Sequence, residues 1–174
     1  MQGSAPVKYI IGILTTDISL RNEILTILSN KIGEIDYVSD WYPFPDTNVY
    51  SPEMGRGLKR SFISIKDLNP PEELPKLKAI TTKIEDKYRV SGKRTINLDP
   101  GYIDHFKIVL ASGKFAMQRM ALTKGCYAEI LMYYEKGRFQ PLPWCYPDFA
   151  KKTYEKDMLV IRRLFKGERR FTDN

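Results

Sequence analysis

The strongest constraint on the fold is a near-continuous apolar segment close to the start of the chain, residues 7–14. Its β-branched residues favour a strand, and its lack of polar alternation predicts burial on both faces, as in the centre of a sheet. The segment is too short and too interrupted for a signal sequence or a membrane span, and no later segment reaches spanning length. We therefore expect a soluble, cytoplasmic protein organised around this strand, with no membrane partner.

Helix and strand patterns alternate after this segment. Apolar residues at helical spacing predict a helix over residues 20–32 and a second helix over residues 70–88. Strand patterns occupy residues 35–42, 59–66 and 94–99. The order β-α-β-β-α-β predicts an α+β fold with a ferredoxin-like core, in which two helices cover one face of an antiparallel sheet.

The patterns after residue 99 predict further strands and a helix in addition to this core. Residues 106–111 and 115–122 fit a strand or a helix by periodicity alone, and we favour strands. Glu135-Lys136-Gly137 is typical of the turn of a C-terminal β-hairpin, and residues 154–165 predict a last amphipathic helix. We expect a single domain over residues 1–174, with flexible tails at residues 1–6 and 168–174.

The composition favours an anionic partner. The chain has 28 Lys and Arg against 21 Asp and Glu, a net charge of +7, and a pI of about 9.3. Such a balance fits a nucleotide, another phosphorylated small molecule or RNA, and it is also a common means of keeping a protein soluble. The two cysteines, Cys126 and Cys145, have no C-x-x-C or histidine companion, which argues against a zinc site and fits a reducing compartment. No metal ligand set is expected.

A polar row lies in the middle of the chain. On a strand, Thr95, Asn97 and Asp99 would share one face, opposite Ile96 and Leu98. The sequence Asp99-Pro100-Gly101-Tyr102 then has the composition of a type II β-turn, with glycine where positive φ is needed. An anion or metal site at a strand end would explain this pattern. A solvated strand face followed by a tight turn explains it as well, and we favour that interpretation.

The segment Gly55-Arg56-Gly57-Leu58-Lys59-Arg60 is the best candidate for anion binding. Glycines permit close backbone approach, and the cations neutralise the anion. The segment lacks the G-K-[ST] ending of a P-loop and leads into a strand, so a glycine-rich turn with solvated cations remains an alternative. The predicted ligand-binding residues are Arg56, Lys59, Arg60, Arg94, Asn97, Tyr102 and Arg119.

Catalytic groups are harder to assign from sequence. No nucleophile elbow is present, and general acid-base chemistry needs two groups within hydrogen-bond reach. Asp99, His105 and Glu129 are the candidates for a base. His105 is the only histidine, and a lone histidine beside an aspartate is more often a surface residue than a catalytic group.

Several motifs in order give the chain a resemblance to a known family. They are Gly12-Ile13-Leu14-Thr15, Pro52-Glu53-Met54-Gly55-Arg56-Gly57-Leu58-Lys59-Arg60, Asn97-Leu98-Asp99-Pro100-Gly101-Tyr102, Tyr127-Ala128-Glu129 and the segment of residues 139–148. With these motifs the chain resembles the domain of unknown function 4416 family of prokaryotic proteins. The family has no established activity, and some members carry a GTP-binding label that the missing P-loop does not support. The resemblance also implies that histidine is common at the position of Gln118, where this chain departs.

Three functions remain open from the sequence. The first is binding of a phosphorylated or nucleotide-like ligand at the basic loop and the polar strand end. The second is an enzyme acting on a phosphate-containing substrate. Asp99 or Glu129 would be its base or a metal ligand, and Arg56, Lys59 or Arg119 would hold the anion. The third is RNA binding through the basic face and exposed aromatic residues, for which affinity should fall steeply with salt.

Overall fold

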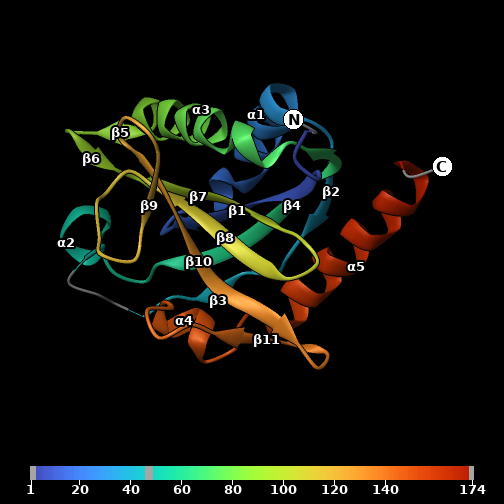
Figure 1. Ribbon diagram of the computed structural model, residues 1–174. Coiled ribbons are helices and arrows are strands. Elements are labelled where there is room, and N and C mark those ends of the chain that lie inside the picture. Colours follow the sequence, from blue (N-terminus) through green and yellow to red (C-terminus); the bar gives the residue numbers. More distant parts are fainter. Residues whose placement is uncertain (1–2, 46–48, 173–174) are drawn as a thin grey trace.

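The computed structural model describes residues 3–45 and 49–172, and within them a large antiparallel sheet is flanked by helices (Figure 1). The strand order is β11-β10-β8-β7-β1-β4-β2, with β3 paired to β4 and β9 paired to β10. The strands of this sheet are β1 (Val7–Thr15), β2 (Ile35–Val38), β3 (Tyr42–Pro43), β4 (Lys59–Asn69), β7 (Ile96–Ile103), β8 (Lys107–Ser112), β9 (Met120–Thr123), β10 (Cys126–Glu135) and β11 (Arg138–Pro141). Two short strands, β5 (Arg89–Val90) and β6 (Lys93–Arg94), form a separate ribbon.

Helices lie on both faces of the sheet. The helices of the described residues are α1 (Arg21–Ile32), α2 (Ser51–Met54), α3 (Leu74–Lys87), α4 (Pro147–Ala150) and α5 (Glu155–Thr172). Figure 1 shows α1 and α3 together on one side of the sheet, and α5 on the other side. None of the helices in residues 3–45 and 49–172 combines the length and the apolarity needed to cross a bilayer. The predicted α+β class is confirmed, while the sheet is larger than a four-stranded core because β8, β9, β10 and β11 continue it beyond β7.

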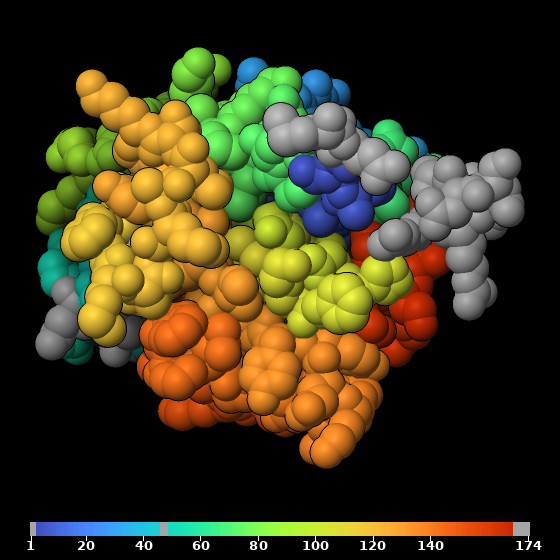
Figure 2. Space-filling view, viewed as in Figure 1, coloured from blue at the N-terminus to red at the C-terminus, as the bar shows by residue number. Residues whose placement is uncertain are grey.

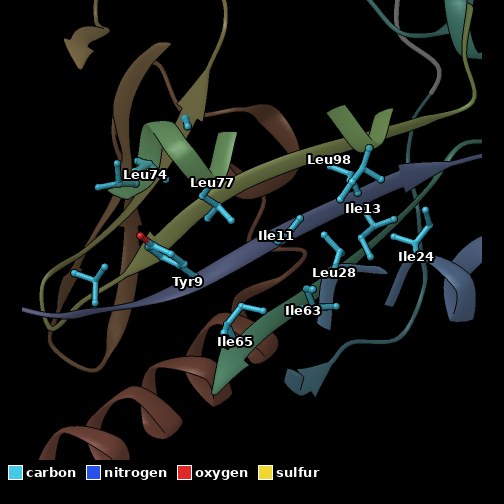
Figure 3. Close-up of a cluster of buried hydrophobic side chains, with 14 of the residues drawn as sticks. Tyr9, Ile11, Ile13, Ile24, Leu28, Ile63, Ile65, Leu74, Leu77 and Leu98 are labelled. Carbon is cyan, nitrogen blue, oxygen red and sulfur yellow. The ribbon is translucent and has the colours of Figure 1, made fainter. Parts of the chain in front are cut away.

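The predicted central position of β1 is confirmed. All nine of its residues are buried, between β4 on one side and β7 on the other. Figure 3 shows Tyr9, Ile11 and Ile13 of β1 within the cluster that α1 and α3 cover. Lys8 is the one charged residue of the strand, and its Nζ donates to Asp36 Oδ2 at 2.6 Å and to the carbonyl of Ile65 at 2.8 Å. These bonds compensate for the loss of hydration.

A second core lies under α5. Ile10 of β1 and Phe62 of β4 point to this face and meet Tyr154 and Ile161 from the C-terminal part of the chain. Asp157 of α5 is buried and accepts hydrogen bonds from the hydroxyls of two tyrosines, Tyr37 at 2.5 Å and Tyr42. The helix is therefore held by a buried polar contact as well as by apolar packing. It continues to Thr172 and so includes residues 168–172, which the sequence assigned to a flexible tail.

The predicted turn at Asp99-Pro100-Gly101-Tyr102 is wrong, because β7 runs straight through these residues. Gly101 does not take the positive φ of a turn; its role is to allow close approach of β8. A β-carbon at Gly101 would lie 2.1 Å from the carbonyl oxygen of Val109. Glycine therefore marks a tight strand contact here, which is one of the few roles of glycine inside a strand.

Pro100 marks the point where β7 and β8 separate. The two strands pair only at Gly101↔Leu110, Tyr102↔Val109 and Ile103↔Ile108. Two residues before Pro100, the N–H of Leu98 donates to Glu85 Oε1 at 2.6 Å, and its carbonyl accepts from Lys78 Nζ at 3.4 Å. Alternate residues of a strand direct their backbone groups to the same edge, so Pro100 faces β8 and has no N–H to offer. Side chains of α3 therefore bond the backbone groups of Leu98 that β8 does not reach, and β7 and β8 separate here.

Two other predicted strands are shorter than expected. Residues 35–42 divide into β2 and β3, and of residues 115–122 only the part from Met120 onward is in a strand. The predicted hairpin of β10 and β11 is present, and Lys136 and Gly137 both take the positive φ that its turn requires.

Substitution of Gly101 tests the tight contact between β7 and β8. We expect Gly101→Ala to lower the free energy of unfolding by about 1–3 kcal/mol, because the neighbouring backbone cannot move aside as a flexible side chain would. Denaturant unfolding measures this change. Gly113→Ala is the control, since its β-carbon would come no closer than 3.9 Å to the nearest atom outside its chain neighbours. Equal losses in the two variants would contradict the assignment.

Candidate functional site

A cavity of about 510 Å³ lies where β7 and β8 separate. Both faces of the sheet contribute to it, because α3 approaches from one side and side chains of β4 and β7 from the other. The segment after β8 and the segment around α4 complete its walls. The lining residues are Phe44, Val49, Tyr50, Arg60, Lys78, Thr82, Glu85, Arg94, Asn97, Asp99, Leu110, Ala111, Ser112, Gly113, Lys114, Arg119, Tyr146, Pro147, Asp148 and Phe149.

Arg60 and Asp99 form an ion pair across the central strand. Arg60 lies on β4 and Asp99 on β7, and β1 runs between them. The guanidinium crosses over Gly12, where a β-carbon would lie 3.0 Å from Arg60 Nη1, and Nη1 donates to Asp99 Oδ2 at 2.6 Å. Arg60 is 4% exposed, and its guanidinium carbon lies 4.9 Å from the centre of the Phe44 ring. The pair is a fixed part of the cavity wall.

Arg94 lines the part of the cavity that α3 also lines, and the carboxylate of Glu53 holds its guanidinium group. Its Nε donates to Glu53 Oε1 at 2.9 Å and its Nη2 to Glu53 Oε2 at 2.7 Å, a two-point contact that fixes the guanidinium plane. Its Nη1 donates to Asn97 Oδ1 at 2.6 Å and lies 4.0 Å from Glu85 Oε2. The hydrogen bonds from Arg94 lower the pKa of Glu53 despite partial burial of the carboxylate.

Arg119 is held in the same way on the opposite wall. Glu129 of β10 is fully buried and accepts from Arg119 Nη2 at 2.9 Å, from the Tyr146 hydroxyl at 2.6 Å and from Gln118 Nε2 at 2.9 Å. Arg119 Nη1 also donates to the carbonyl of Lys114. Burial raises the pKa of Tyr146, and the hydrogen bond to Glu129 and its charge raise it further. The hydroxyl therefore remains a donor.

Two lysines of the cavity differ from the three arginines. Across the described residues, Lys78 and Lys114 have no carboxylate within ion-pair distance, whereas each arginine has one. Two arginine donors are also unused, because the buried Nε atoms of Arg60 and Arg119 have no hydrogen-bond partner. The charge of each arginine is therefore balanced by a carboxylate at short range, and the two unused Nε donors are enclosed in the protein.

The pKa values of two carboxyl groups of the cavity, Glu85 and Asp99, shift in opposite directions. Burial raises the pKa of Glu85, although Lys78 and the N–H of Leu98 oppose it. Burial acts in the same direction on Asp99, but the charges of Arg60 and Lys78 outweigh it and hold the pKa of Asp99 below its usual value. Asp99 is thus ionised at neutral pH, while Glu85 takes up a proton more readily than an exposed glutamate does.

No group of three or more His, Cys, Asp or Glu side chains in residues 3–45 and 49–172 is arranged to hold a metal ion.

The structure brings together part of the predicted set of residues. Arg60, Arg94, Asn97 and Arg119 line one cavity with Asp99, and Glu129 lies behind its wall.

The other predicted residues lie elsewhere. Arg56 and Lys59 are exposed and outside the cavity lining, and Tyr102 packs against the core under α3. The ring of His105 lies 4.8 Å from that of Phe165 on α5, and its carbonyl accepts from Arg162. His105 does not line the cavity.

Sequence reasoning missed the contribution of α3. Lys78, Thr82 and Glu85 occur at i, i+4 and i+7, a polar stripe beside the apolar face of the helix, and all three line the cavity. This spacing was visible in the sequence, but nothing there said that the sheet would open beneath the stripe. Tyr146 and Asp148 were likewise hidden in a proline-rich segment.

The fold and the cavity define a small α+β protein with a cleft in an opened sheet, lined by apolar surface together with five cationic and three acidic side chains. Residues 5–165 match the sequence model of the family described as "Domain of unknown function (DUF4416)", so the chain belongs to this family and the resemblance seen in its motifs is confirmed. Searches of curated proteins and of solved structures find no match.

The buried contact of Glu129 gives a test of the cavity wall. We expect Glu129→Gln to lower the free energy of unfolding by about 3 kcal/mol, because Arg119 would keep its charge in a buried place without a counter-charge. Thermal and denaturant unfolding measure the loss. In the control, Glu34→Gln removes an exposed ion pair with Lys66, which contributes about 0–1 kcal/mol. Similar losses in both variants would show that Glu129 is not the structural centre of this wall.

Proposed function

We propose that the protein binds a phosphorylated or nucleotide-like small molecule in the cavity between β7 and β8. The observation that carries the proposal is a pair of lysines that line the same cavity, Lys78 and Lys114. Neither has a carboxylate within ion-pair distance in residues 3–45 and 49–172. A cation that already has a counter-ion gains little from a ligand. A lysine with no carboxylate at ion-pair distance keeps more of its attraction for an anion, although Asp99 and Glu85 act on Lys78 from further away, and its compact ammonium group suits a phosphate.

The arginines support the same ligand in another way. Because Glu53, Glu129 and Asp99 fix their guanidinium groups, little conformational freedom is lost when a ligand binds. A phosphorylated ligand carries several strong acceptors, so it can accept hydrogen bonds from more than one of these cationic side chains at once.

The remainder of the cavity suits an organic group attached to the phosphate. Phe44, Tyr50 and Tyr146 provide aromatic surface, and a volume of about 510 Å³ is in the range of small-molecule sites. Burial raises the pKa of Tyr50 to about 12, so its hydroxyl is neutral at physiological pH. A flat, base-like group beside a phosphate would use both kinds of surface.

Calorimetric titration with nucleotides and sugar phosphates tests this function. Lys78→Ala and Lys114→Ala should each weaken binding about 10-fold or more, since a hydrogen bond to a charged group contributes about 1.5–3 kcal/mol. Arg56→Ala and Lys59→Ala are matched controls, because they remove the same charge from exposed positions outside the cavity. Their affinities should stay within about twofold of the unchanged protein at moderate salt. Saturable binding to none of these ligands, or equal losses in all four variants, would overturn the proposal.

A second candidate function is an enzyme acting on a phosphate-containing substrate. The supporting observation is that Asp99 and Glu85 line one cavity while their pKa values move apart, an arrangement found in acid-base pairs. Here Asp99 would be the ionised group and Glu85 the proton donor.

Asp99→Asn tests the second candidate. Turnover of a bound phosphate ester should fall about 100-fold or more in this variant, the usual contribution of a positioned acid or base. Ligand affinity, measured separately, reports whether the cavity survives the loss of the ion pair with Arg60. Retained turnover with an intact cavity would rule out Asp99 as the catalytic group, and absence of turnover in the unchanged protein would leave binding as the function.

We also propose that β1, β2, β4 and β7, with α1 and α3, are the ferredoxin-like core expected from the sequence. The order β7-β1-β4-β2 among these strands and the placement of both helices on one face support this interpretation. A cytoplasmic location remains part of the proposal, and the two free thiols, Cys126 and Cys145, support it.

A further inference from the structure

The segment between β8 and β10, residues 113–125, has an unusual surface, and we call it the arm. Four of its apolar side chains are exposed: Phe115 to 78%, Met117 to 95%, Met120 to 57% and Leu122 to 43%. Figure 2 shows the arm in yellow to orange on one side of the molecule. Single exposed apolar residues are ordinary, but four within eight positions indicate a contact surface.

The arm is also cationic. It contains Lys114, Arg119 and Lys124, and the chain has no Asp or Glu at all from residue 105 to residue 128. This charge argues against a second copy of the chain as the partner, because two arms would bring like charges together. It favours a partner that is a polyanion and that also offers flat apolar surface.

The arm is continuous with the cavity. Gly113, Lys114 and Arg119 belong to the arm and line the cavity as well. A ligand whose phosphate lies near Lys114 can therefore extend outward along the arm without leaving the protein surface. Phe115 is the first exposed ring on this path, and it is paired edge-to-face with Tyr127 at 6.0 Å between ring centres.

We propose that the natural ligand is the phosphorylated end of a single-stranded nucleic acid. The terminal nucleotide would occupy the cavity, and the next nucleotides would follow the arm. A single strand combines the two properties that the arm complements, since its phosphates attract Lys114 and Lys124, and its bases stack on aromatic rings such as that of Phe115. This inference rests on the proposed function, because the cavity supplies the site for the terminal phosphate.

Fluorescence anisotropy with hexauridylate tests the inference directly. The probes are the oligonucleotide with a 5′-phosphate, with a 3′-phosphate and with neither, and uridine monophosphate serves as the competitor. We expect one phosphorylated oligonucleotide to bind about 10-fold or more tightly than the mononucleotide and than the unphosphorylated oligonucleotide. Its affinity should fall with salt with a logarithmic slope of about −0.7 for each backbone phosphate contacted.

Two exposed phenylalanines give a matched pair of variants. Phe115→Ala should weaken binding of the oligonucleotide about 5- to 100-fold, the loss of one stacked base, and should leave binding of the mononucleotide unchanged. Phe106→Ala is the control, because Phe106 is 70% exposed at the opposite end of β8. A second pair, Lys124→Gln and Lys83→Gln, compares an arm lysine with an exposed lysine of α3.

The outcomes separate this inference from the proposed function. Equal affinity for mononucleotide and oligonucleotide, or equal effects of Phe115→Ala and Phe106→Ala, would overturn the arm as a nucleic-acid surface while leaving the cavity as a ligand site. Oligonucleotide binding that ignores the terminal phosphate and the Lys78→Ala substitution would overturn the link between arm and cavity. Absence of binding to every oligonucleotide would overturn this inference, whereas the proposed function is decided by the calorimetric titrations with nucleotides and sugar phosphates.

Discussion

The architecture depends on the contact between β7 and β8 at Gly101. The carbonyl of Val109 occupies the space that any larger residue would need, so the two strands are clamped together at this point. One residue earlier, Pro100 has no N–H, and the ladder ends. Lys78 and Glu85 of α3 then bind the free backbone groups of Leu98. The tight contact at Gly101 and the end of strand pairing at Pro100 are adjacent, so β7 and β8 separate at a fixed place. The cavity forms there.

The cationic side chains of the cavity are of two kinds, those with a carboxylate partner and those without one. Arg60, Arg94 and Arg119 each have a carboxylate partner and serve as fixed walls. In the part of the chain that the structure describes, no carboxylate lies within ion-pair distance of Lys78 or Lys114. Because desolvated charges are costly unless paired, a fold can retain unpaired cations only where solvent or a ligand reaches them. The same cavity edge continues into the exposed arm, so the anion-binding and apolar surfaces form one path.

Much of the fold could be predicted from periodicity. The apolar run of β1, the spacing of α1 and α3 and the glycine of the last hairpin all correspond to elements of the structure. The site was predicted only in part. Arg60, Arg94, Asn97 and Arg119 were selected for their chemistry and do share a cavity, whereas Arg56 and Lys59 point to solvent. Sequence neighbours on a strand alternate between faces, so a basic run cannot all enter one site.

The sequence by itself determined the order of elements, the central place of β1 and the excess of positive charge, because these follow from local patterns and composition. Only the tertiary structure decided the meaning of Pro100 and Gly101, which have the composition of a turn and yet lie inside a strand. It alone also paired Arg60 with Asp99 across Gly12 and Arg119 with Glu129 and Tyr146. Such contacts join residues that are distant in sequence, and local propensity carries no information about which distant strand will supply the partner.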